Sequence, residues 1–140
     1  MPALNKLHRE YRDRAAFYVV YIQEAHAIDG WQTEENLEED VLVASTTTPE
    51  ERMKVAGACL RKLQIDFPAV VDDADESVER AYTGWPDRLY VIDREGRIAH
   101  KGGPGPYGFK PEEVEATLAL LLQAAPTGPE ARGERPPRLF

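Results

Sequence analysis

The sequence predicts an α/β domain in which a mixed sheet is flanked by helices on both faces. Strand-like segments separated by helical ones occupy the first half of the chain, an order that is typical of α/β folds. A hairpin pattern and an amphipathic helix follow in the second half. The chain has 140 residues, 42% of them hydrophobic, which is enough for one domain with a core.

The beginning of the chain combines a helix without a clear start and two buried strands. Residues 3–11 place apolar side chains at helical spacing, but no good N-cap precedes them. Residues 16–23 form a continuous apolar run rich in β-branched and aromatic residues, which predicts a central strand covered on both faces. Residues 41–44, after a long polar stretch, predict a second short buried strand.

The clearest helix begins after Thr48. The run Thr-Pro-Glu-Glu supplies an N-cap, a proline at the first helical position and Glu51 three residues after the cap, which together predict a capping box. A strand at residues 67–72 follows, and Pro68 favours an edge position for it. The helix is expected to bury one apolar stripe, made of Met53, Ala56, Leu60 and Leu63.

The second half of the domain predicts a short helix, a hairpin and a last helix. The short helix is expected at residues 77–82. Residues 89–92 and 97–101 flank a turn in which Gly96 supplies the positive φ angle. Pro111 can start the last, amphipathic helix.

Composition and charge limit the classes of partner. We expect a single domain at residues 1–125, followed by a disordered tail rich in proline, glycine and charge at 126–140. A net charge of −8 disfavours nucleic acid, and no apolar run is long enough for a membrane helix. One cysteine and no recognisable signal peptide favour the cytoplasm.

Three segments of the sequence resemble the iodothyronine deiodinase family. They are VVYIQEAHAIDGW at 19–31, AYTGWPDRLYVIDREGRI at 81–98 and KGGPGPYGFKPEEVEATL at 101–118. The order of the elements is that of a thioredoxin-like fold lacking its first strand and part of its first helix. The resemblance therefore identifies a bacterial-type member of this family, truncated at its N-terminus.

The resemblance implies reductive dehalogenation of a small molecule, with a thiol reductant as the second partner. The family's nucleophile, a cysteine or selenocysteine, stands at the N-terminus of the first helix, where the helix dipole stabilises a thiolate. The matching position would precede Met1, so no residue of this chain corresponds to it. A peroxiredoxin-like thiol-disulfide reductase and a non-catalytic thioredoxin-like binding module are the alternatives.

The same resemblance provides candidate site residues. Glu24 and His26 follow the first strand and are carried over as the catalytic pair, with His26 as acid or anchor and Glu24 orienting it. Trp31, Trp85 and Pro86 are carried over as substrate-binding residues. Pro86 is expected to be cis. A polar loop at 24–26, and a Trp31 that only packs its loop onto the domain, are the structural alternatives.

The remaining reactive side chains have structural interpretations. Cys59 is expected to be buried and inert, and His8 to be solvated. Three scattered histidines and one cysteine give no metal-ligand spacing, and the loop at 102–109 lacks the Lys-Ser/Thr of a phosphate loop, so no cofactor is expected. The acids at 72–76 are interpreted as helix caps. Loss of the first strand would leave unpaired edges that promote association, which makes a homodimer possible.

Overall fold

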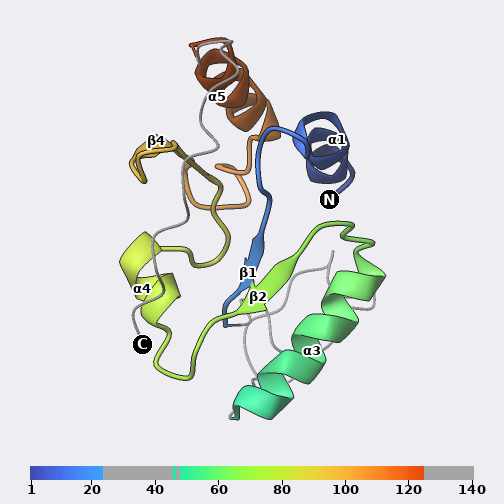
Figure 1. Cartoon of the computed structure of the whole chain (residues 1–140). Helices are drawn as coiled ribbons and strands as arrows, with labels where there is room; N and C mark the ends of the chain where they lie inside the picture. Colours follow the sequence, from blue (N-terminus) through green and yellow to red (C-terminus); the bar gives the residue numbers. More distant parts are fainter. Residues whose placement is uncertain (24–45, 47, 125–140) are drawn as a thin grey trace, which may run out of the picture.

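The computed structural model describes residues 1–23, 46 and 48–124, and in these it confirms the expected order of elements (Figure 1). The expected strand at 41–44 and the tail at 126–140 lie outside the described residues. The elements are α1 (Pro2–Tyr11), β1 (Val19–Tyr21), α3 (Pro49–Lys62), β2 (Ala69–Val71), α4 (Ser77–Tyr82), β3 (Tyr90–Ile92), β4 (Ile98–Lys101) and α5 (Pro111–Ala124).

The described strands pair in two small sheets rather than in one mixed sheet. β1 and β2 are parallel, with Val20 opposite Val70, and β3 and β4 are antiparallel, with Tyr90 opposite Lys101. Gly96 has a φ of +79° in the turn between β3 and β4, as expected. Among the described strands, no hydrogen-bonded ladder joins the two pairs.

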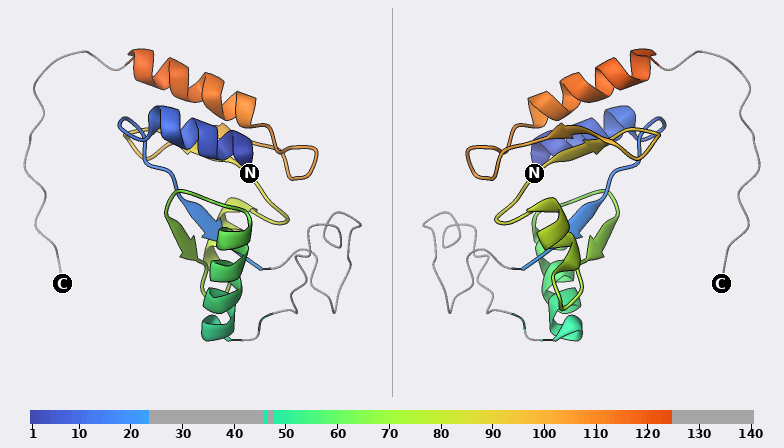
Figure 2. Two further views of the ribbon diagram at one scale, coloured as in Figure 1. Left: turned by 90° about the vertical axis from the view of Figure 1, so that its right-hand side faces the viewer. Right: turned by 90° about the vertical axis from the view of Figure 1, so that its left-hand side faces the viewer.

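The core lies where α1 and α5 meet the β3–β4 hairpin (Figure 2). α5 contacts both strands of the hairpin and also α1, while α3 packs on β2. Leu7, on α1, is the most buried side chain of the cluster formed here, at 3% exposed. The core cluster consists of Leu4, Leu7, Phe67, Val91, Val114 and Leu118.

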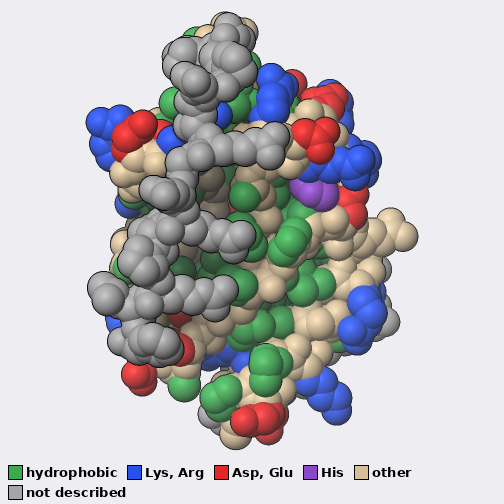
Figure 3. Space-filling model, in the orientation of Figure 1, with side chains coloured by type: hydrophobic (Ala, Val, Ile, Leu, Met, Phe, Trp, Pro, Cys, Tyr) green, Lys and Arg blue, Asp and Glu red, His purple; other side chains and the backbone are tan. Residues whose placement is uncertain are grey.

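The expectation that β1 is covered on both faces is wrong for the described residues. Val20 is 39% exposed, its partner Val70 on β2 is 49% exposed, and Tyr18 just before β1 is 65% exposed. Side chains alternate between the faces of a strand, so Tyr18 and Val20 point to the same side. Figure 3 shows hydrophobic side chains gathered over the part of the molecule that β1 and β2 occupy in Figure 1.

The capping box of α3 is confirmed, but one residue of the expected buried stripe, Met53, is exposed. Glu51 donates its backbone N–H to the Thr48 hydroxyl at 3.2 Å, and the Glu51 carboxylate accepts the Thr48 N–H at 3.2 Å. Met53, expected in the stripe, is 56% exposed, whereas Arg52 and Ala56 are buried. The reason is that the Arg52 guanidinium finds polar partners inside the fold.

The expectation that His8 is solvated is also wrong. Its ring packs against Phe17 and Phe67, with ring centroids 5.6 and 5.3 Å apart, and its Nδ1 lies 2.9 Å from Asp66 Oδ1. Arg9 donates to the other carboxylate oxygen at 2.9 Å. Partial desolvation raises the pKa of Asp66, but the hydrogen bonds from His8 and Arg9 outweigh it and leave the pKa below its ordinary value. These contacts attach α1 to the segment that precedes β2.

Candidate functional site

The turn that carries Trp85 and Pro86 lies between α4 and β3. Its Trp85–Pro86 peptide bond is cis, as expected from the sequence. Trp85 is 43% exposed, whereas Pro86 is half-buried. The structure therefore brings together two of the five candidate site residues, both in one short turn.

Glu79 on α4 holds this turn in place. Its backbone carbonyl accepts the N–H of Gly84 at 3.0 Å, and its carboxylate accepts the N–H of Trp85 at 3.4 Å. Gly84 also faces the end of β1, because a Cβ at this position would lie 3.5 Å from Ile22 Cδ1. The turn thus adjoins the point where β1 leads toward residues 24–26.

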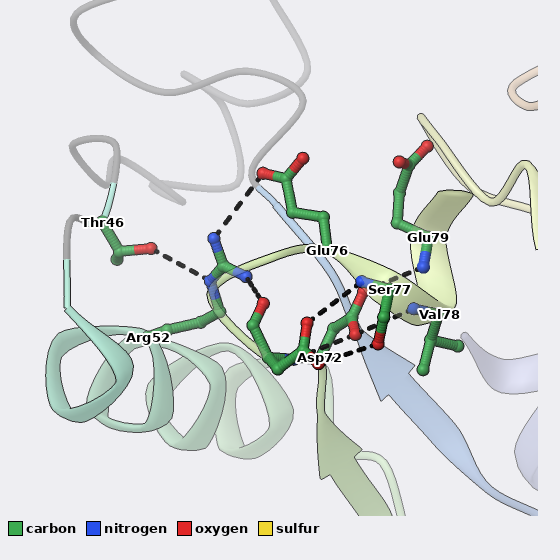
Figure 4. Close-up of polar contacts among 8 residues, drawn as sticks. Thr46, Arg52, Asp72, Glu76, Ser77, Val78 and Glu79 are labelled. Carbon is green, nitrogen blue, oxygen red and sulfur yellow. Dashed lines mark hydrogen bonds and ion pairs between the residues drawn. The ribbon is translucent and has the colours of Figure 1, made fainter. Parts of the chain in front are cut away.

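Asp72, at the end of β2, fixes the start of α4 (Figure 4). Its buried carboxylate accepts three backbone N–H groups, from Asp73 at 2.9 Å, Val78 at 3.1 Å and Glu79 at 2.8 Å. Asp73 in turn accepts the N–H and hydroxyl of Ser77, and the backbone hydrogen bond from Ser77 is the main cause that lowers the pKa of Asp73. The interpretation of these acids as helix caps is confirmed.

Arg52, which the sequence pattern did not indicate, is buried and helps to hold the turn that leads into α4. Its side chain, 9% exposed, donates to the Asp73 carbonyl at 2.7 Å and lies 3.8 Å from the Glu76 carboxylate. Its Nε contacts the Thr46 hydroxyl at 3.5 Å. Figure 4 shows the guanidinium between α3 and the turn that leads into α4. Periodicity could not reveal this role, because the carbonyl it binds lies 21 residues away.

An aromatic pair stands beside the Trp85 turn. The rings of Tyr82 and Tyr90 meet edge to face with centroids 5.1 Å apart, and the Tyr90 hydroxyl donates to the Tyr82 carbonyl. Lys101 Nζ lies 5.8 Å from the centre of the Tyr90 ring. This pair links the end of α4 to the hairpin and so fixes both sides of the turn.

The remaining candidate site residues lie outside the described part of the chain, and Cys59 differs from its expected burial. Glu24, His26 and Trp31 lie outside the described residues. Cys59 is half-buried on α3, so the expectation that it is buried is not met. No group of side chains with metal-ligating chemistry occurs in residues 1–23, 46 and 48–124.

The fold and the turn together define an α/β protein of the thioredoxin-like class. The iodothyronine deiodinase family model matches residues 1–121, which is most of the chain. The chain therefore belongs to the iodothyronine deiodinase family.

Curated relatives with deiodinase names support the same assignment. The chain is 35% identical over 114 residues to the type I iodothyronine deiodinase of Xenopus laevis, covering 81% of this chain and 43% of that protein. It is 32% identical to the thyroxine 5-deiodinase of Rattus norvegicus and 33% identical to that of Homo sapiens, covering 99% and 84% of this chain and 42% and 37% of those proteins. The chain thus spans about two fifths of the length of these relatives. Among its described helices, none has the length and apolarity needed to cross a membrane.

Proposed function

We propose that this chain forms the substrate-handling part of a deiodinase-like oxidoreductase that removes halogen from a small aromatic molecule. The observation that carries the proposal is the family match over residues 1–121. The exposed indole of Trp85 on a turn held by α4 supports it, because such a surface suits stacking with an aromatic ring.

The proposed reaction needs a nucleophile, and no residue of this chain corresponds to the one of the family. A thiolate or selenolate ahead of Met1 would attack the iodine of a carbon–iodine bond and form a sulfur–iodine or selenium–iodine bond. The electron pair of the broken bond stays on carbon, which takes a proton from His26. A dithiol reductant then restores the nucleophile, releasing iodide and becoming a disulfide.

The roles proposed for this chain's residues follow from its family. His26 serves as acid or anchor and Glu24 orients its ring, while Trp31, Trp85 and Pro86 bind the substrate. Ile22, which packs against Gly84, precedes Glu24 by two residues. We propose that Glu24 and His26 act on the same ligand as the Trp85 turn.

The test is a chain extended upstream to include a cysteine or selenocysteine, assayed with iodothyronines and with peroxide. We expect iodide release that falls at least tenfold in His26→Ala and less, through a higher KM, in Trp85→Ala. Cys59→Ser is the control and should keep full activity. This thiol belongs to α3, whereas the Trp85 turn lies between α4 and β3. Peroxide reduction without iodide release would favour the peroxiredoxin-like alternative. Inactivity toward both substrates would favour the binding module.

Three finer assignments belong to the same proposal. Selenocysteine is one of two options for the nucleophile, and cysteine is the other. A cytoplasmic location is supported by the single cysteine of the chain. A homodimer is supported by sheet edges that no strand of the described residues covers, and sedimentation of the purified chain would test it.

A further inference from the structure

Directly after the Trp85–Pro86 turn, three successive residues bind one loop, residues 102–109. Asp87 accepts the Gly105 N–H on its backbone carbonyl at 3.0 Å. Arg88 donates from Nη1 to the Gly102 carbonyl at 3.2 Å, and Leu89 accepts the Gly102 N–H at 2.8 Å. The 102–109 loop is therefore attached to the chain at the point where the turn ends.

The side chain of Asp87 also packs closely against Gly105 of this loop. A methyl group built on Gly105 would overlap the Asp87 carboxyl, and one built on Gly108 would overlap the backbone of Gly103. The loop is closed on itself by the Gly108 N–H, which donates to the Pro104 carbonyl at 2.9 Å. The absence of side chains at positions 105 and 108 is what lets the Asp87 carboxyl and the loop pack together.

One oxygen of this carboxyl is buried without a partner. Asp87 Oδ2 is inaccessible to solvent and accepts no hydrogen bond from the described residues. Burial raises the pKa of Asp87 above its ordinary value of 3.8. An ionised carboxylate in this place lacks the donors that usually offset its desolvation, whereas a protonated one is neutral.

Arg88, the next residue in the chain, does not offset the charge of Asp87. Its Nη1 donates to the Gly102 carbonyl, and its Nε is buried without a partner among the described residues. Burial is the cause of the raised pKa of Asp87, and no charged neighbour contributes to it. Deprotonation places a charge in the packed contact with Gly105.

We propose that Asp87 is a proton-controlled latch, whose carboxyl holds the 102–109 loop against the Trp85–Pro86 turn when neutral and loosens it when ionised. The consequence for substrate positioning rests on the proposed function, whereas the latch itself does not. A pKa raised in the closed state means that closure is strongest below pH 3.8 and weakens as the pH rises through the raised pKa. Each unit of the shift changes the closing equilibrium about tenfold.

Amide hydrogen exchange followed by NMR tests the latch on this chain without any substrate. After correction for the intrinsic pH dependence of exchange, protection of the Gly105 N–H should fall several-fold between about pH 4 and pH 8 in the wild type, along with the titration of the Asp87 carboxyl. Asp87→Asn, uncharged and of the same shape, should make protection independent of pH. Asp13→Asn, which changes an exposed carboxylate on another segment, should keep the wild-type profile.

Gly105→Ala provides a second, steric test, because the added methyl group displaces the Asp87 carboxyl. We expect rapid exchange of the Gly102 N–H in this variant at every pH. Two results would overturn the proposal, namely an Asp87→Asn profile that still follows pH as in the wild type, or a carboxyl titration of Asp87 at its ordinary value. The wild-type titration decides the matter even if a variant does not fold. Failure of iodide release in the extended chain would leave these measurements unaffected.

Discussion

Replacement of Asp72 by alanine should destabilise the protein strongly through the start of α4. The carboxylate is 5% exposed and accepts three backbone N–H groups at 2.9, 3.1 and 2.8 Å. A hydrogen bond to a charged group contributes about 1.5–3 kcal/mol, and loss of a cap costs about 0.5–2 kcal/mol, but bonds to one group are not additive. We expect the free energy of unfolding to fall by about 2–4 kcal/mol.

Urea unfolding followed by far-UV circular dichroism measures this loss. Asp72→Asn should lose less, about 1–2 kcal/mol, because one acceptor oxygen remains. Asp75→Asn, at an exposed position in the same acidic run, is the matched control and should change stability by less than about 0.5 kcal/mol.

The same substitution should disturb the candidate site, because α4 carries the residue that holds the Trp85 turn. In a Trp31→Phe background, fluorescence reports on Trp85 alone, and Asp72→Ala should shift its emission under conditions where the protein is still folded. The reasoning is refuted if Asp72→Ala costs less than about 0.5 kcal/mol, which is the scale of an ordinary surface substitution.

Three further predictions concern the core, a charged contact and two glycines. Leu7→Ala should lower the free energy of unfolding by about 2–5 kcal/mol, whereas Leu120→Ala, at a side chain 69% exposed, should be nearly neutral in the same urea assay. The lowered pKa of Asp66 means that its stabilising contribution is present above pH 3.8 and is lost as the pH falls through the folded-state value, so Asp66→Asn should remove stability at pH 6 and little at pH 2. Gly96→Ala should destabilise the protein by about 1 kcal/mol, because φ is +79° at this position. Gly57→Ala on α3 should stabilise it by up to about 1 kcal/mol, because only the end of the Arg61 side chain lies near the added methyl group. Thermal melts compare the two variants.

Local features of this fold could be predicted from the sequence because their causes lie within a few residues. The capping box joins Thr48 and Glu51 across three positions, and the hairpin turn needs only the freedom of Gly96. The acids before α4 act on N–H groups up to seven residues away. The family resemblance likewise pointed to Trp85 and Pro86 through a contiguous segment, while the roles of Glu24, His26 and Trp31 stay predictions.

Only the tertiary structure decided which side chains are buried by residues distant in the sequence, because the periodicity of apolar residues carries no information on such contacts. A charged stretch around His8 indicates solvation, yet its ring packs against Phe17 and Phe67 and contacts Asp66, which lies 58 residues away. An apolar stripe on α3 points to Met53, yet Arg52 is buried instead because a distant carbonyl satisfies its guanidinium. The sequence by itself determined where helices and strands form and which family the segments resemble. Only long-range packing determined the buried polar contacts, because a polar group is buried wherever the folded chain provides its partner.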